Sequence, residues 1–281
     1  MNAHGASGAA RPLRGMAFMV IAYGFITIND ASMKWTLTSL PVPQAIAIRG
    51  LFALLLLIAL SALLGRLGNL RWRNPLAQVA CALTFTISMF CLITAFSYLP
   101  IALAIVIISS GPIYVTVLAP VLLGETVGWW RRGAVLLGFA GTIIVMQPGT
   151  DGFTWPMLLP LIAAVFNAIR EMIIRRVIGA ESSISMVLTS MAFVTLIAAA
   201  ASPFVWQPPA ATDIALLALA AAALSVGLVL VFEAIRSADV SIVSPFQYAG
   251  ILWASLAGYL IWSDVPTFAT TLGATLIITG G

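Results

Sequence analysis

Ten apolar runs, each about as long as a bilayer is thick, follow one another along this 281-residue chain. A transmembrane helix needs about 20 apolar residues to cross the hydrocarbon layer. The chain is 62% hydrophobic and only 8% charged, so it has too few charges to cover a water-exposed surface. We therefore predict an all-α polytopic membrane protein with ten transmembrane helices. The runs lie at 13–33, 43–64, 75–97, 100–123, 131–147, 154–178, 184–204, 212–235, 240–262 and 266–281.

The arginines between the runs indicate which side of the membrane each segment faces. Cytoplasmic segments of membrane proteins carry an excess of Lys and Arg. If the N-terminus is inside, the outer segments hold only Lys34, and the inner segments hold ten arginines. This distribution predicts a multi-pass membrane protein with both termini in the cytoplasm. The ten are Arg11, Arg14, Arg66, Arg71, Arg73, Arg131, Arg132, Arg175, Arg176 and Arg236.

Two pairs of similar segments indicate that the chain is a tandem repeat. "IAYGFITINDASMKW" at 21–35 resembles "IAAVFNAIREMIIRR" at 162–176, and "GETVGWWRRGAVLLGFAG" at 124–141 resembles "SDVPTFATTLGATLIITG" at 263–280. We expect a disordered cytoplasmic tail at 1–12, a first five-helix repeat at 13–148 and a second at 149–281. Because five is odd, the second repeat enters the membrane from the opposite side.

An inverted repeat is the architecture of alternating-access transporters, which bind substrate near the midplane between the halves. The simpler explanation is a duplication that only builds a stable bundle. Three further features accompany the repeat: a "GE" pair closing the fourth run, a fifth run with spaced glycines, and Arg49 early in the second run.

Together these features resemble the drug/metabolite transporter (DMT) superfamily of the EamA type, and within it the YddG-type amino-acid exporters. The resemblance implies export of amino acids, aromatic ones among them, and of related metabolites across a bacterial inner membrane. The chain departs from the pattern at two points. Its second half has no arginine matching Arg49, and Asp264 stands where a glutamate is expected.

The sequence offers few candidate residues for enzyme catalysis. The only histidine is His4, outside the apolar runs, so Ser–His and Cys–His catalysis within them is excluded. No Gly-x4-Gly-Lys loop, metal-ligand spacing or basic run is present. We expect no enzyme activity, cofactor, metal or nucleic acid partner. The expected partners are a small-molecule substrate and the lipid bilayer, with no obligate protein partner.

Ionisable residues within membrane spans are costly and are functional candidates. Asp30 and Arg49 lie at similar depth from the outer face, and Glu171 near the inner face, so each is a candidate for a gate or an ion pair. The alternative for Asp30 is an i, i+4 pair with Lys34. Glu125 is a candidate hinge or interface anchor at the end of the fourth run.

Neutral polar and aromatic residues near the midplane predict a substrate cavity. The candidates are Ser88, Ser110, Tyr114, Asn167, Ser244, Gln247 and Tyr248. Pro112 and Pro245 remove backbone hydrogen bonds and are candidate hinges. For each serine, the alternative is a hydrogen bond to its own or a neighbouring helix.

These observations predict a secondary active or facilitative transporter that exports small organic metabolites, above all amino acids, by alternating access. Two other functions stay open at this point. One is a passive channel for small solutes, because no coupling-ion site is evident. The other is a non-transporting membrane scaffold.

Overall fold

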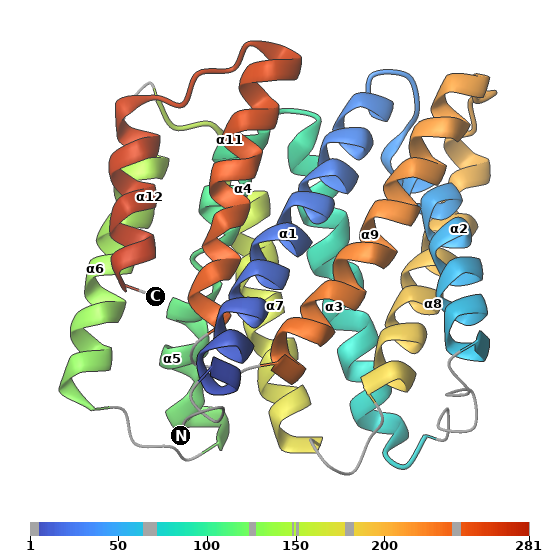
Figure 1. Cartoon of the computed structure of the whole chain (residues 1–281). Coiled ribbons are helices and arrows are strands. Elements are labelled where there is room, and N and C mark those ends of the chain that lie inside the picture. Colours follow the sequence, from blue (N-terminus) through green and yellow to red (C-terminus); the bar gives the residue numbers. More distant parts are fainter. Residues whose placement is uncertain are drawn as a thin grey trace.

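The computed structural model describes residues 6–63, 72–123, 128–147, 149, 152–177, 183–237 and 243–280. All regular secondary structure within these ranges is helical (Figure 1). Seven segments there are long and apolar enough on their own to cross a membrane. Together with shorter apolar helices, they confirm the predicted all-α membrane fold.

The helices follow the predicted runs. The first half contains α1 (Ala6–Thr36), α2 (Val42–Leu63), α3 (Pro75–Phe96), α4 (Ile101–Ile108), α5 (Gly111–Leu123) and α6 (Trp129–Met146). The second half contains η2 (Trp155–Met157), α7 (Leu158–Val177), α8 (Ser183–Ala201), η3 (Ser202–Val205), α9 (Ala211–Ser237), η4 (Ser244–Tyr248), α11 (Ala249–Trp262) and α12 (Phe268–Gly280). The fourth run is divided into α4 and α5, and α1 begins within the segment expected to be a tail.

Helix contacts follow the two-fold pattern of an inverted repeat. α1 packs against α9 as α3 packs against α7, and α2 contacts α9 as α3 contacts α8. The pairs α2–α8, α4–α11 and α6–α12 join equivalent helices of the two halves. In Figure 1, α6 and α12 stand together at one side and α2 and α8 at the other. The halves are therefore interleaved rather than stacked as separate domains.

Two close helix contacts depend on glycine. A Cβ on Gly273 would meet Val145 and the Gly141 carbonyl, so α6 and α12 approach closely. A Cβ on Gly50 would collide with Thr195, so α2 lies directly against α8. Small residues allow such approach between membrane helices. Gly138 and Gly141 of the fifth run therefore serve packing within this chain.

We call the face at which α1 ends the upper face and the opposite one the lower face, as in Figure 1. Several contacts join the two halves at the upper face. The Lys34 Nζ lies 3.9 Å from the Asp264 Oδ2 and 5.0 Å from the centre of the Trp262 ring. Other contacts join Ser39 with Asp213, Gln44 with Gln207, Tyr98 with Trp155, and Trp35 with Trp262.

Candidate functional site

Two helix breaks meet at the centre of the bundle. α4 ends at Ile108, a turn at Ser109 and Ser110 follows, and α5 begins one residue before Pro112. The Ser109 Oγ donates to the Ile105 carbonyl at 2.6 Å, and the Ser110 Oγ donates to the Ile107 carbonyl at 2.6 Å. These hydroxyls donate hydrogen bonds to backbone carbonyls near the break. Irregular backbone inside a membrane needs such hydrogen-bond partners from the protein.

The second-half counterpart is η4, a 3₁₀ segment that contains Pro245 and leads into α11. α4 packs against α11, and residues of both breaks, Ser109 in the first and Gln247 in the second, line one cavity. Proline prevents a continuous α-helix in both places. A hinge function for Pro112 and Pro245 remains a prediction.

A cavity of about 400 Å³ lies between the halves, next to these breaks. Its size is in the range of small-molecule sites. Eight of the predicted residues line it: Asp30, Arg49, Ser88, Pro112, Asn167, Glu171, Gln247 and Tyr248. The polar side chains Tyr23, Thr27, Asn29, Ser109 and Arg170 line it as well.

Equivalent positions of the two repeats contribute to this lining. Adding the repeat spacing of 141 residues to Asn29 and Asp30 gives Arg170 and Glu171, and all four line the cavity. Ile26 and Asn167 form another such pair. The cavity therefore straddles the two-fold axis, which is where an alternating-access transporter binds its substrate.

The upper end of the cavity holds a buried base and a buried acid joined by an amide. The Arg49 Nη1 donates to the Asn29 Oδ1 at 3.2 Å, and the Asn29 Nδ2 donates to the Asp30 Oδ1 at 2.8 Å. Arg49 has no exposed surface and Asp30 is only 7% exposed. The predicted proximity of Asp30 and Arg49 is therefore present, with Asn29 between them. Lys34 pairs with Asp264 instead of Asp30.

The lower end of the cavity also holds one base and one acid. The Arg170 guanidinium lies 4.9 Å from the centre of the Phe85 ring, and the neighbouring Glu171 is exposed. Arg49 has a different residue at the equivalent position, the buried Ser190. Each end therefore has both charges, but the base comes from α2 at the upper end and from α7 at the lower end.

The remaining predicted residues lie elsewhere. Ser110 is fully buried and does not line the cavity, and Tyr114 packs near Ala168 and Met172. Pro245 is exposed and also lies outside the lining. The Ser244 side chain and all of Glu125 lie outside the described residues. Ser88 lines the cavity, but its Oγ donates to the Ala163 carbonyl at 3.0 Å.

Sequence reasoning missed Tyr23 and Thr27. The Tyr23 hydroxyl donates to the Gln247 Oε1 at 3.4 Å across the cavity. Tyr23, Thr27 and Asp30 are spaced i, i+4 and i+7, so they share one face of α1. This polar stripe in an apolar helix was the available signal.

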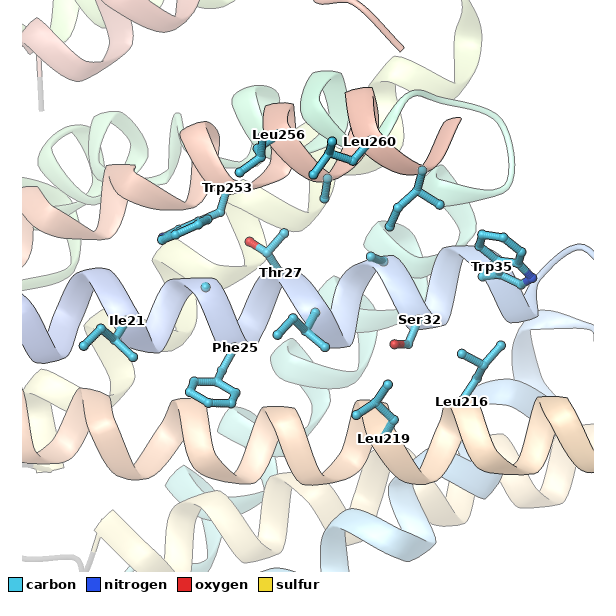
Figure 2. A pocket seen from close by; sticks show the side chains of 15 residues that line it. Ile21, Phe25, Thr27, Ser32, Trp35, Leu216, Leu219, Trp253, Leu256 and Leu260 are labelled. Carbon is cyan, nitrogen blue, oxygen red and sulfur yellow. The ribbon is translucent and has the colours of Figure 1, made fainter. Parts of the chain in front are cut away.

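A second hollow, of about 580 Å³, lies on the outside of the bundle between α1, α9 and α11 (Figure 2). Its lining is almost entirely apolar, and Leu219, Trp253 and Leu260 are exposed. Exposed apolar side chains on a membrane-spanning helix face the lipid hydrocarbon. Thr27 lines both hollows, so this stretch of α1 separates the lipid-facing groove from the cavity.

Comparison with known proteins establishes the family. The model of the EamA-like transporter family matches twice, at residues 13–147 and 154–280. The chain belongs to the EamA-like transporter family. This EamA transporter is thus a small-molecule transporter built from repeated halves, and not an enzyme.

Several curated relatives match over nearly the whole EamA transporter. An S-adenosylmethionine uptake transporter of Rickettsia bellii is 25% identical over 94% of this chain and 90% of the relative. A riboflavin transporter of Rhizobium johnstonii is 27% identical over 96% and 90%. The pseudopaline exporter CntI of Pseudomonas aeruginosa is 23% identical over 94% and 93%.

A solved crystal structure shares the fold of the EamA transporter. The two superpose with a TM-score of 0.64 over 97% of this chain and 95% of the other, at 17% identity. The named cargoes of the relatives differ chemically, so the family alone does not define a substrate. The side chains of the cavity have to do so.

Proposed function

We propose that this EamA transporter moves amino acids, or metabolites that carry an α-amino-acid group, by alternating access. The observation that carries the proposal is the buried pair of opposite charges at the upper end of the cavity. Arg49 offers a cation and Asp30 an anion, and Asn29 holds them in one network. This arrangement is complementary to the carboxylate and ammonium groups of a zwitterion.

The cost of these charges supports a functional role. Ionisable groups within membrane spans are expensive and mark substrate or ion pathways. A purely structural ion pair would bring the guanidinium and carboxylate into direct contact, where their attraction offsets most desolvation. Here Asn29 bridges the pair, so the two charges do not neutralise each other by direct contact, and both residues belong to the cavity lining.

The rest of the cavity supplies room for a side chain. Its volume of about 400 Å³ suits a ligand of amino-acid size or somewhat larger. Tyr23, Phe85 and Tyr248 supply aromatic surface in its lining. S-adenosylmethionine, named for one relative, carries an α-amino-acid group and so presents the same two charges.

For the mechanism, we propose that the halves rock about the central helix breaks. The interhalf contacts at the upper face close that end, and Asp30 and Arg49 are buried beneath them. Glu171 at the lower end is exposed, so this conformation is the more open toward the lower face. Rocking would break the upper contacts and expose Asp30 and Arg49 to the upper face.

We further propose that the lower face is cytoplasmic, on the arginine distribution, and that the protein lies in a bacterial inner membrane. The predicted direction is export. In an alternating-access carrier without a driving ion, the substrate gradient sets the direction of net transport. The named relatives include both an uptake transporter and an exporter.

Ligand-dependent thermal stability of the purified transporter tests the substrate class. L-phenylalanine, L-methionine and S-adenosyl-L-methionine should raise the melting temperature, and the corresponding amines without a carboxylate should not. Asp30→Asn should weaken binding of the zwitterions, because the ammonium loses its anion. The proposal would be contradicted if riboflavin raised the melting temperature and no zwitterion did.

A further inference from the structure

The donors of Arg49 are only partly used by the protein. A guanidinium carries five N–H donors in a rigid planar fork. Nη1 donates to the Asn29 Oδ1, whereas Nε and Nη2 are buried and have no hydrogen-bond partner among the described residues. Arg49 also lines the cavity. It is therefore a fully buried cation in the cavity lining, with two unused donor atoms that a ligand reaches only when the guanidinium turns toward the cavity.

The position of Arg49 is set by the packing of α2. The next residue, Gly50, lies directly against Thr195 of α8, where a larger residue would collide. Within α2, the neighbours Ala45, Ile46 and Ala53 are completely buried. α2 is thus held on both sides of Arg49, and the hydrogen bond to Asn29 fixes one edge of the guanidinium.

The unused donors lie on the edge of the guanidinium that suits a carboxylate. Nε and Nη2 point in parallel directions, and a carboxylate accepts from such a pair with both oxygens. Leaving charged donors buried without acceptors is costly, and a bound anion would remove this cost. A neutral carbonyl ligand accepts with one oxygen and carries no compensating charge.

The other cavity arginine is arranged differently. Arg170 stacks on the Phe85 ring at 4.9 Å, is half-buried, and is next in sequence to Glu171. The position of the second repeat that is equivalent to Arg49 is Ser190. The inverted repeat therefore has one pre-organised fork, and it lies at the upper end.

We infer that Nε and Nη2 of Arg49 bind the carboxylate of the substrate as a bidentate fork, and that this contact makes the transporter select for acids over their amides. The inference rests on the proposed function, which it makes specific: Arg49 holds the carboxylate, and the network through Asn29 places Asp30 for the ammonium. Asn29 is a positioning residue, because it orients both charged groups.

The test compares matched ligands and matched variants in detergent-solubilised transporter. The ligands are L-phenylalanine, L-phenylalaninamide and 3-phenylpropionate, with binding measured by calorimetry. In the wild type, the amide should bind roughly 10- to 100-fold more weakly than the amino acid, as expected for loss of charge-assisted hydrogen bonds. Arg49→Lys keeps the charge but not the planar fork, so it should lower the acid-to-amide ratio several-fold below that of the wild type.

The control is Arg176→Lys, which makes the same substitution at an exposed arginine of the lower face, outside the cavity lining. Its acid-to-amide ratio should equal that of the wild type. A ratio that persists in Arg49→Lys would overturn the inference. If that variant does not fold, the wild type still decides, because equal binding of acid and amide also overturns it.

The third ligand separates this inference from the proposed function. 3-Phenylpropionate has the carboxylate but lacks the ammonium group. If it binds as tightly as L-phenylalanine, and Arg49→Lys weakens it, then the carboxylate fork stands and the zwitterion proposal fails. If none of the three ligands binds the wild type, both fail.

Discussion

Replacing Lys34 with methionine tests how the upper face of the transporter is held closed. The Lys34 Nζ donates to the Leu99 carbonyl at 2.7 Å, lies 3.9 Å from the Asp264 Oδ2 and lies 5.0 Å from the centre of the Trp262 ring. The Lys34 side chain is 13% exposed, and that of Asp264 is 32% exposed. Methionine keeps most of the side-chain packing and removes all three polar contacts.

The contacts differ in strength. A hydrogen bond from a charged donor contributes about 1.5–3 kcal/mol. A partly exposed ion pair contributes at most about 1 kcal/mol, and a cation–π contact about 0.5–1 kcal/mol. Leu99 lies in the same half as Lys34, so only the ion pair and the cation–π contact are lost when the halves separate. Lys34→Met should therefore favour the open state by about 1–2 kcal/mol, or about 5- to 30-fold in population. Asp264→Asn should change it about fivefold at most.

A cysteine in the cavity reports this opening. Gly111 lines the cavity, and a Cβ there would meet no other atom within 4 Å, so Gly111→Cys is tolerated in a background without Cys81 and Cys91. A membrane-impermeant maleimide is applied to intact cells and to inverted vesicles. Its reaction rate follows the open-state population if opening and closing are faster than labelling.

Lys34→Met should raise labelling from the outside about 5- to 30-fold, and Asp264→Asn about fivefold at most. An equal or larger effect of Asp264→Asn would show that the ion pair, not the cation–π contact with Trp262, holds the face closed. Unchanged labelling from both sides in Lys34→Met would refute the assignment of these contacts to a gate. An increase confined to inverted vesicles would reverse the proposed orientation.

Two further substitutions test the packing of the halves. Gly273→Val should abolish the monodisperse peak in size-exclusion chromatography, because the side chain would collide with the Gly141 carbonyl, whereas Gly133→Val, which meets no atom within 4 Å at Cβ, should not. Gln44→Ala removes two hydrogen bonds to the Gln207 backbone, at 2.6 and 2.9 Å, and should lower the melting temperature by about 4–8 °C, measured by differential scanning fluorimetry.

Much of the fold could be predicted from the sequence because a membrane imposes a simple rule on helix length. Apolar runs of about 20 residues marked the spans, and the repeat at 21–35 and 162–176 indicated the two halves. The break at Ser109 and Ser110 was predicted only as a disturbance at Pro112. The point at which α4 stops depends on its packing against α7 and α11, which no local pattern encodes.

The cavity lining was harder to predict, because the direction in which successive side chains point changes at a helix break. Tyr114 and Tyr248 each follow a serine by four residues, at 110 and 244. η4 runs as a 3₁₀ helix to Tyr248, whereas α5 is α-helical from Gly111. A 3₁₀ helix turns by a larger angle per residue, so the two tyrosines point in different directions. Tyr248 lines the cavity and Tyr114 packs in a neighbouring cluster.

Contacts between distant segments had no sequence signal. Lys34 and Asp264 are far apart in the chain. In the sequence, Lys34 has a closer candidate partner in Asp30, and Asp264 is the repeat equivalent of Glu125. By contrast, Asp30 and Arg49 were found together because both lie about 10 Å below the same face, by helical rise from α1 and α2. The depth of a residue in the membrane can be predicted from the sequence, whereas the residues that it contacts on neighbouring helices cannot.

Counterflow in proteoliposomes tests the central claim most directly. Vesicles containing the purified transporter are loaded with unlabelled L-phenylalanine, L-methionine or S-adenosyl-L-methionine and diluted into a trace of the same labelled compound. Alternating access with a zwitterion site predicts transient, saturable accumulation of label for at least one of them. Flux that rises linearly with concentration and shows no counterflow would indicate a channel, and the absence of any flux for the zwitterions would contradict the account.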